Sequence, residues 1–504
     1  MGYKHGAYGE ITESKVTEIK QANVVAAYIG TAPINLIRGY AELDLVNMPL
    51  KISNMNDVTS KVGFSEDWEK FTLCETFKQH FDNSVSDTEE DITGNVGPIY
   101  IVNILNPDTC KSSEKTTKAL VFTNKRAEFK CSDIILDTLA IEDKVEGVDY
   151  TLEYNFKKGS VIVNLLKDIE SPTVSCTFNT VDTSRITKND VIGSQTEEGE
   201  YTGLYALKLL YQYHNAILNI LAAPGWSHIP EVYKAMVSIT QKLNGHWDGF
   251  VNADIPLEDE KGSKINTIAK AIEWKSENGY NYENSKVYWP KIQDSDGRVY
   301  HISTSATATM LRTDLKNNGV PFESPSNKEI MATKQYFGAD SNSRGFDQET
   351  ANKLNENGIT TACFWNGAWV LWGPHTAAYK YHDETDAEQV EIDARAIFDV
   401  NLRMLMYITN SFQVDHGTEI DSPMTPQDKD TVLNFEKQKL DNLCGIGALI
   451  GTPTIEFLEV NNPTTNLMNG DFVWNFAVTN TPPCKSETAR ICYTDEGFSA
   501  FFSE

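Results

Sequence analysis

Val24 to Pro33 reads VVAAYIGTAP, and this stretch decides the fold class. Its first six residues are apolar on both faces, and Gly30 and Pro33 break the run. Strands that are covered on both sides, as in parallel sheets, have continuous apolar runs of this kind. The stretch therefore predicts a buried strand of an α/β sheet.

Further along the chain, strand and helix patterns alternate. Ile217–Ala223 and Gly249–Ile255 have the apolar character of buried strands, and Pro230–Leu243 between them has its apolar residues on one helical face. Asn366-Gly367 predicts a tight turn between two strands within Ile359–Trp372. Alternation of this kind predicts a mainly parallel, three-layer α/β architecture.

Residues 116–184 have a different pattern. Short β-rich pieces follow one another, turn residues such as Lys158-Gly159 separate them, and no long helical pattern intervenes. This texture predicts an all-β module, a small sandwich that is inserted into the chain.

The last part of the chain predicts an α+β unit. Glu388–Phe412 has the pattern of a long helix, and Thr425 with Pro426 opens a second helix that Gly445 ends. Three β-prone segments follow this helix. They are Thr454–Val460, Asp471–Val478 and Ala489–Phe502.

The two ends of the chain are too apolar for plain disordered tails and too isolated to fold alone. Residues 1–22 include a Gly-rich, aromatic stretch, and Ala489–Phe502 is β-prone. An unpaired strand pairs with another edge, so each end could join a neighbouring copy. The alternative is that both ends dock on their own domain, as many termini do. The residues that we expect to make contacts between subunits as arms are Tyr3, Tyr8, Ile11, Val16, Ile491, Tyr493, Phe498 and Phe501.

Length and composition exclude several classes of protein. A chain of 504 residues is too long for one core and suggests about three domains. The formal net charge of −27 repels DNA phosphates and anionic membrane surfaces, so nucleic-acid binding is not expected, and a basic partner remains open. Because neither a signal-peptide pattern nor an apolar run of roughly 20 residues is visible, we expect a soluble protein made in a cytoplasm.

The cysteine pattern agrees with a reducing compartment. The eight cysteines are scattered, with no C-x-x-C pair and no Cys/His cluster at zinc spacing. In a chain of this length, buried reduced thiols are the expected state. Cys484 and Cys492 could approach each other across a hairpin.

Several segments marked by Gly and Pro occur along the chain in the order typical of one family. Leu221–Ser227, which reads LAAPGWS, is the sharpest of them. Together they resemble the tail sheath proteins of contractile phage tails and related bacteriocins, over essentially the whole chain. The other segments are Tyr3–Gly6, Ile29–Pro33, Ile192-Gly193, Thr202–Leu204, Asn318–Pro321, Pro325–Asn327, Asn357–Thr360 and Trp369–Gly373.

The resemblance implies a domain plan. The expected parts are an N-terminal arm (1–22), the N-terminal part of the sheath α/β region (23–115), the β-sandwich insert (116–184), a subtilisin-like three-layer α/β domain (185–376) and a C-terminal α+β domain with a terminal strand arm (377–504). It further implies that the arms donate strands to neighbouring subunits and that the C-terminal domain faces an inner tube. We expect the insert and Gly279–Arg344 to face outward, where variation is best tolerated.

The hypothesis that follows is a structural subunit, not an enzyme, that needs no cofactor and no metal. It would polymerise helically around an inner tail tube and contract to drive this tube through the envelope of a target cell. Expected partners are further copies of the chain, the inner tube protein, and baseplate and tail terminator proteins, with no nucleic acid and no membrane insertion. The place would be a virion tail or tail-like particle, assembled in the cytoplasm of a bacterial host. The alternatives are a subtilisin-fold hydrolase and another self-assembling viral tube or shell protein.

Contact with the inner tube has its own candidates. Lys429, Lys437 and Lys439 lie on the helix predicted after Thr425, and exposed charge pairs are weak enough to separate when a sheath contracts. The alternative is that this is an ordinary amphipathic surface helix.

The hydrolase alternative needs a Ser hydroxyl next to a His base that an Asp holds in place. Ser303–Thr307 is the only helix start loosely like a subtilisin nucleophile turn, and it lacks the Gly-Thr-Ser-Met-Ala pattern. His228 follows a strand, but with 71 acids in the chain such coincidences are expected. We therefore expect no catalytic residues.

A metal site could be read from one cluster of His and Asp. His375 and His382 stand near Asp383 and Asp386, but the spacing fits no standard ligand set. Solvated loop residues are the favoured interpretation. Gly30–Pro33 likewise lacks the glycines and the Lys of a phosphate loop.

Overall fold

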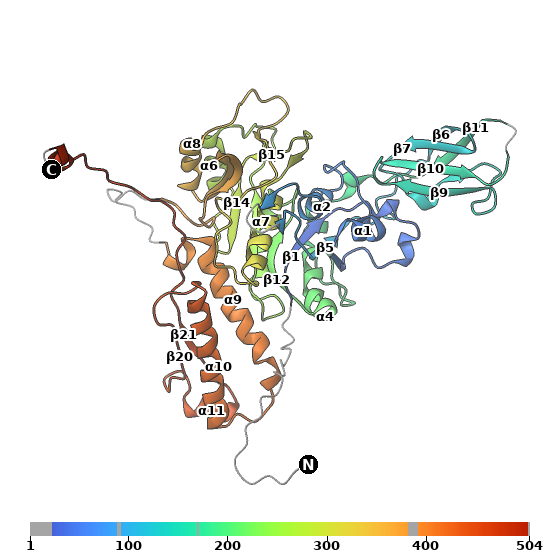
Figure 1. Ribbon diagram of the computed structural model, residues 1–504. Coiled ribbons are helices and arrows are strands. Elements are labelled where there is room, and N and C mark those ends of the chain that lie inside the picture. The colour runs from blue at the N-terminus through green and yellow to red at the C-terminus, as the bar shows by residue number, and fades with distance from the viewer. Residues whose placement is uncertain (1–22, 88–91, 169–170, 382–391, 502–504) are drawn as a thin grey trace, which may run out of the picture.

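The computed structural model describes residues 23–87, 92–168, 171–381 and 392–501. Its centre is an eight-stranded sheet in the order β19-β18-β14-β13-β12-β1-β5-β2 (Figure 1). The strands are β1 (Asn23–Gly30), β2 (Pro49–Ile52), β5 (Ile99–Asn103), β12 (Ala216–Ala222), β13 (Phe250–Asp254), β14 (Ser285–Tyr288), β18 (Ile359–Trp365) and β19 (Ala368–Trp372).

The strands from β18 to β5 run parallel, and the two outer strands, β19 and β2, run antiparallel to their neighbours. The buried strand predicted from the apolar run that starts at Val24 is β1, which pairs with β12 on one side and with β5 on the other. All residues of β12, β13 and β14 are buried, so both faces of the sheet are covered. The predicted α/β character is therefore confirmed, and residues 23–115 and 185–376 both supply strands to this one sheet.

Helices cover the sheet. The helices of this region are α1 (Met55–Asp57), α2 (Cys74–Phe81), α3 (Lys188–Ile192), α4 (Leu210–His214), α5 (Pro230–Thr240), α6 (Ile268–Glu277), α7 (Ile302–Lys316) and α8 (Gln348–Asn355). Small strands accompany them: β15 (Lys291–Gln293), β16 (Val299–Tyr300) and β17 (Lys334–Tyr336) form one sheet, and β3 (Ser86–Asp87) pairs with β4 (Ile92–Thr93).

Both edges of the central sheet are occupied. On β2, His214 Nε2 lies 2.7 Å from the carbonyl oxygen of Pro49, and Lys61 donates to the carbonyl of Lys51 at 3.2 Å. Along β19, the segment 327–330 forms backbone hydrogen bonds to Trp369 and Leu371 at 2.7 to 3.1 Å. Since free backbone groups at an edge attract further strands, the backbone hydrogen bonds along β19 protect that edge from added strands.

The middle segment departs from the expectation that it faces outward. Within Gly279–Arg344, helix α7 is buried along nearly its whole length, so the prediction is wrong for this helix. Its sequence looks polar because it is rich in Ser and Thr. Three of the threonine hydroxyls donate to the carbonyl four residues earlier: Thr307 to Ser303 at 2.8 Å, Thr309 to Ser305 at 2.9 Å and Thr313 to Thr309 at 2.8 Å. A hydroxyl satisfied in this way can be buried.

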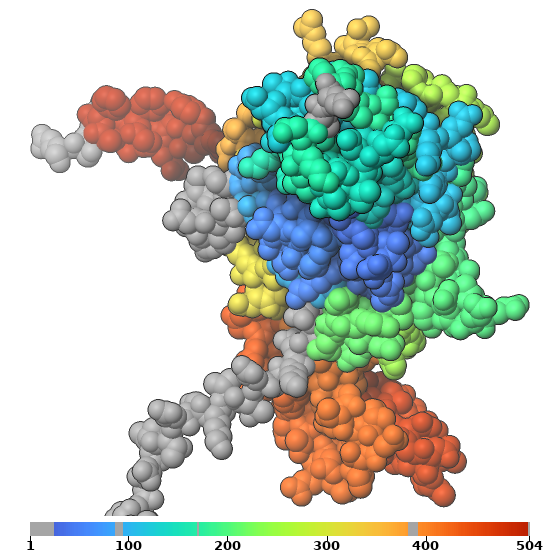
Figure 2. All heavy atoms as spheres, turned by 90° about the vertical axis from the view of Figure 1, so that its right-hand side faces the viewer, coloured from blue at the N-terminus to red at the C-terminus, as the bar shows by residue number. Residues whose placement is uncertain are grey.

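Residues 116–178 form two three-stranded sheets that pack on each other. One sheet has the order β6-β11-β8 and the other β7-β10-β9. Their buried side chains, among them Phe129, Val163 and Phe178, form a core of their own. Figure 1 shows this part at one end of the molecule, and in Figure 2 it faces the viewer. The strands are β6 (Thr116–Val121), β7 (Arg126–Lys130), β8 (Ala140–Ile141), β9 (Tyr150–Asn155), β10 (Ser160–Leu165) and β11 (Thr173–Phe178).

The C-terminal unit projects downward from the body in Figures 1 and 2, in a different direction from the β module. It consists of α9 (Asp399–Asp415), α10 (Pro426–Gly445), β20 (Thr454–Glu456), α11 (Thr464–Asn469) and β21 (Asn475–Ala477). Helix α9 was predicted to begin at Glu388; in the structure it begins at Asp399, after the 3-10 turn Ala394–Ala396, and residues 382–391 lie outside the described part. Helix α10 begins as predicted, with Thr425 and Asp428 in a reciprocal capping box and Pro426 in the first turn.

The terminal strand is not formed within the single chain. The described part of Ala489–Phe502 contains no strand, and Glu496–Phe501 is a 3-10 turn. A strand needs an edge to pair with, and this segment meets none in its own chain.

Two buried ion pairs join α9 to the body. Lys286 Nζ on β14 lies 2.5 Å from Asp399, and both side chains are at most 1% exposed. Arg403 pairs with Asp314 of α7, which is also buried. Removing one partner of such a buried ion pair lowers the free energy of unfolding strongly, because the remaining charge is buried without a partner.

We expect Lys286→Met to destabilise the unassembled chain by about 3–5 kcal/mol, since it leaves the Asp399 carboxylate buried without its partner. The double variant Lys286→Met/Asp399→Leu should recover most of this loss. Urea unfolding followed by fluorescence measures both changes. A single variant as stable as the wild type would contradict the role of this pair.

Candidate assembly surfaces

The N-terminus of α7 is where a hydrolase site would have to lie. Ser303 donates its backbone N–H to Asp254 Oδ1 at 3.0 Å, and its hydroxyl also hydrogen-bonds the Asp254 carboxylate. The hydroxyl of Ser227 lies 3.4 Å from the same carboxylate. Asp254, at the end of β13, thus caps the buried helix from outside it.

No described histidine stands between this Ser and Asp. His301 Nδ1 is 2.7 Å from Glu75 instead, and burial lowers the pKa of His228 to about 3. Burial likewise raises the pKa of Asp254. A nucleophilic Ser needs an imidazole that takes its proton. The hydrogen bonds between Ser303 and Asp254 therefore fit a helix cap and not a catalytic site.

No group of three or more His, Cys, Asp or Glu in the described ranges could hold a metal ion. Of the four residues that could be read as a metal site, only His375 is described. Its Nδ1 lies 2.9 Å from the carbonyl oxygen of Ile397, and its ring stacks on Tyr379 at 3.5 Å between centroids. Helices of the described part are all too short or too polar to cross a membrane.

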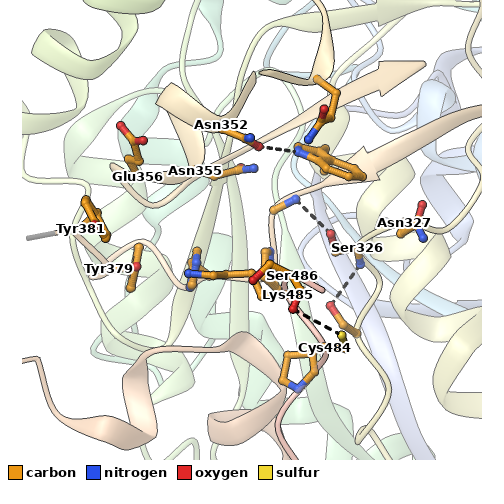
Figure 3. A pocket seen from close by; sticks show the side chains of 17 residues that line it. Ser326, Asn327, Asn352, Asn355, Glu356, Tyr379, Tyr381, Cys484, Lys485 and Ser486 are labelled. Carbon is orange, nitrogen blue, oxygen red and sulfur yellow. Dashed lines mark hydrogen bonds between the residues drawn. The ribbon is translucent and has the colours of Figure 1, made fainter. Parts of the chain in front are cut away.

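A cleft of about 450 Å³ lies where the C-terminal extension leaves the body (Figure 3). One wall is α8 with Tyr379 and Tyr381, and the extension residues Pro483–Ser486 form another. Some polar side chains of the cleft form hydrogen bonds with each other. Trp372 Nε1, for example, donates to Asn352 Oδ1 at 3.0 Å. Because the extension is itself a wall, the shape of this cleft depends on where the extension lies.

The C-terminal extension begins after Thr481, which still bonds to the body through its backbone N–H to Ala448 at 3.2 Å and its hydroxyl to Gly447 at 2.6 Å. The arm candidates beyond it are all exposed: Ile491 (93%), Tyr493 (83%), Phe498 (54%) and Phe501 (81%). Figure 1 shows this end pointing away from the molecule. The N-terminal candidates Tyr3, Tyr8, Ile11 and Val16 lie outside the described residues.

The described cysteines are all free, and four of them are buried, as expected for reduced thiols. Cys484 and Cys492, which were predicted to approach each other across a hairpin, are both exposed and lie on the extension. Two others, Cys131 and Cys444, are half-buried.

Strands β20 and β21 form a small sheet of two antiparallel strands, with Ile455 opposite Phe476. In the described part of the chain no third strand joins them. Two-stranded sheets are marginal on their own and gain from additional strands. This sheet, unlike the central one, is suited to accept a strand from outside.

The three lysine candidates on α10 all face carboxylates of their own chain. Lys429 lies 2.8 Å from Asp430, and Lys437 lies 2.5 Å from Asp441. Lys439 pairs with Asp415 and lies 3.2 Å from Glu436. All three lysines remain partly exposed, and Lys439 joins a charge network with Asp415 and Glu436. That the lysines contact an inner tube stays a prediction.

His416 completes this network at the end of α9. Its Nε2 lies 2.9 Å from Glu436 and its Nδ1 lies 3.0 Å from Glu419. Burial alone would lower the pKa of His416, but the two hydrogen bonds to carboxylates outweigh it and the pKa is raised. Both ring nitrogens can donate only when the imidazole is protonated.

We expect the stabilisation from His416 to depend on pH. Because its pKa is higher in the folded chain than in the unfolded one, the stabilisation is complete below about pH 6.5 and is lost as the pH rises through the folded pKa. Thermal unfolding of wild type and His416→Gln at pH 6 and pH 9 measures this. The difference in Tm should be larger at pH 6; an equal difference at both pH values would contradict the charged state.

The comparisons with known proteins agree on one kind of protein. No family model matches the chain. The tail sheath protein of Burkholderia phage BcepMu is 23% identical over 519 residues, which cover 98% of this chain and 97% of the relative. The major tail sheath protein of Serratia phage KSP20 is 25% identical over 64% of this chain and 76% of its own length.

A solved structure has the same fold. It is the PVC sheath complex of an extracellular contractile injection system in its contracted state, with a TM-score of 0.53, 12% identity, and 99% of both chains covered.

Proposed function

We propose that this chain, which is related to phage tail sheath proteins over nearly its whole length, is the structural subunit of a contractile tail sheath. The observation that carries the proposal is the match of 98% of the chain to 97% of a tail sheath protein. The subunits polymerise helically around an inner tube and contract to drive it through the target envelope. The geometry around Ser303 gives the hydrolase alternative no support.

The exposed ends supply the connections between subunits. A Leu- or Phe-sized side chain gains roughly 1.5–3 kcal/mol when it is buried, so the exposed apolar side chains of the extension favour a state in which a neighbour covers them. Twenty residues beyond Thr481 span about 66 Å when extended, enough to reach a neighbouring copy. The extension adds as a strand to β20 and β21 of that neighbour, and the arm of residues 1–22 does the same from the other end.

Contraction needs no bound fuel in this mechanism. Identical contacts that do not close into a ring give a helix of stacked subunits. The extended sheath buries less surface than the contracted one and is held metastable by its contacts with the baseplate and the inner tube. Even about 2 kcal/mol per subunit, summed over roughly a hundred subunits, is ample for the stroke. Each subunit then moves as a rigid body while its arms keep neighbours linked.

We also propose that the domains of the chain meet at residues 22, 115, 184 and 376. The three-layer α/β region is proposed to be subtilisin-like. Its support is the parallel sheet with a buried helix, α7, that starts at the carboxyl end of β13. The place is the tail of a virion or of a tail-like particle, and assembly occurs in the cytoplasm of the bacterial host.

Electron microscopy of the purified chain tests the proposal. The wild type should form hollow tubes of wide bore, whereas a chain that ends at Thr481 should stay a folded monomer because it lacks the donated strand. Ile491→Asp/Tyr493→Asp should act in the same direction, and Val121→Asp, at an exposed position of the insert, is the matched control. Long tubes from the truncated chain would contradict strand donation, and a wild type without tubes would contradict the function.

A further inference from the structure

The C-terminal extension begins where the chain stops pairing with itself. The segment after β21 runs antiparallel to residues 448–450. In the described part of the chain, its last backbone hydrogen bond to the rest of the molecule joins the N–H of Thr481 to the carbonyl of Ala448, at 3.2 Å. Pro482 and Pro483 follow directly. The two prolines therefore stand at the point where the paired strand passes into the exposed extension.

The simplest third strand for the sheet β20–β21 is the extension of the same chain. Strands that follow one another in sequence usually pair, and the β-prone segment Ala489–Phe502 follows β21 closely. A hairpin turn directly after Thr481 would bring this segment back along β21. Such closure within one chain competes with pairing between copies, because tethered partners have a high effective concentration. A chain that donates this segment to a neighbour has to prevent that closure.

Two consecutive prolines exclude such a turn. The two-residue hairpin turns need a positive φ at their first central residue, whereas the proline ring holds φ at about −65°. A type II turn needs a positive φ at its second central residue, which Pro483 excludes in the same way. A type I turn is disfavoured because a residue that precedes a proline avoids the helical region that its first central position requires. The chain therefore cannot reverse at Pro482-Pro483.

The prolines direct the chain toward the body instead. Residues Pro483–Ser486 line the cleft beside α8 (Figure 3), and Figure 1 shows the extension running on from there, away from β20 and β21. Its apolar side chains stay uncovered, with Ile491 93% and Tyr493 83% exposed. Pro482 is itself exposed, so burial in a core does not account for it. Consecutive prolines favour the stiff polyproline II conformation, which carries the chain about 3.1 Å per residue.

We propose that Pro482 and Pro483 form a rigid elbow that keeps the extension from pairing with β21 of its own chain and so reserves it for a neighbouring copy. Proline at a sheet edge is one of the features by which proteins prevent unwanted strand pairing. The inference rests on the strand donation proposed above and explains why the donated segment is free when a neighbour arrives. The two prolines act through the segment that follows them, so they are positioning residues.

Pro482→Gly/Pro483→Gly in the full-length chain tests the elbow, since glycine permits the turns that proline excludes. In the monomer fraction, hydrogen exchange at the amides of residues 489–494 should slow at least tenfold relative to the wild type, because these amides then pair with β21. The concentration needed for tube formation should rise at least tenfold. Pro482→Ala/Pro483→Ala should change both quantities in the same direction by a smaller factor. Pro172→Gly, at an exposed proline of the insert, is the control and should change neither.

The exchange measurement on monomers tests the elbow whether or not tubes form, and circular dichroism establishes that each variant is folded. Adding Ile491→Asp/Tyr493→Asp to the glycine variant should remove the protection, as expected for a paired strand. Three results would overturn the proposal: a glycine variant that forms tubes like the wild type, one that loses tubes while its extension exchanges as fast as in the wild type, or protection already present in the wild-type monomer. Tubes from the chain that ends at Thr481 would refute strand donation instead, and a wild type without tubes would refute the proposed function.

Discussion

A β-sheet with a free edge pairs with any strand that reaches it. In the central sheet of this chain the segment 327–330 covers β19, and side chains of His214 and Lys61 contact two carbonyls of β2. In the proposed assembly, copies do not join by extending this sheet. The proposed strand pairing uses the two-stranded sheet β20–β21 and the chain ends. In this proposal the central sheet, which has to stay folded, is thus separate from β20–β21 and the chain ends, which pair with other copies.

This separation requires a firm joint between the two parts. The joint is the start of α9, where Asp399 and Arg403 pair with Lys286 and Asp314 of the body. All four side chains are buried, so a hinge at this place would expose or strand a charge. In the proposed sheath each subunit moves as a rigid body, which requires its two parts to keep a fixed relative position. A joint closed by two buried ion pairs resists relative movement of the two parts.

The sequence predicted the elements whose pattern is local. VVAAYI reads as a buried strand because its apolar run is continuous, and the box around Thr425 marks the start of α10 from four residues alone. The burial of α7 was not predicted because its Ser and Thr look polar, whereas in the structure three of the threonine hydroxyls bond within the helix. The pairing of Lys439 with Asp415 escaped because the partners lie 24 residues apart. The strand expected near Ile491 is absent because strand propensity acts only where an edge is present.

The chain enters and leaves the β module of residues 116–178 at neighbouring points, and the module also contacts the body, for example through Asn35 Nδ2, which donates to the carbonyl of Ile134 at 2.8 Å. Lys111, just before it, and Val181, just after it, form an antiparallel bridge, so the chain leaves the body and returns at the same place. Its core is built from side chains of the module such as Val161 and Cys176, together with Leu36 of the body. A module joined in this way can be enlarged, shrunk or exchanged while the strand order of the central sheet stays the same. The outer surface of the particle can thus vary while the central sheet of each subunit is kept.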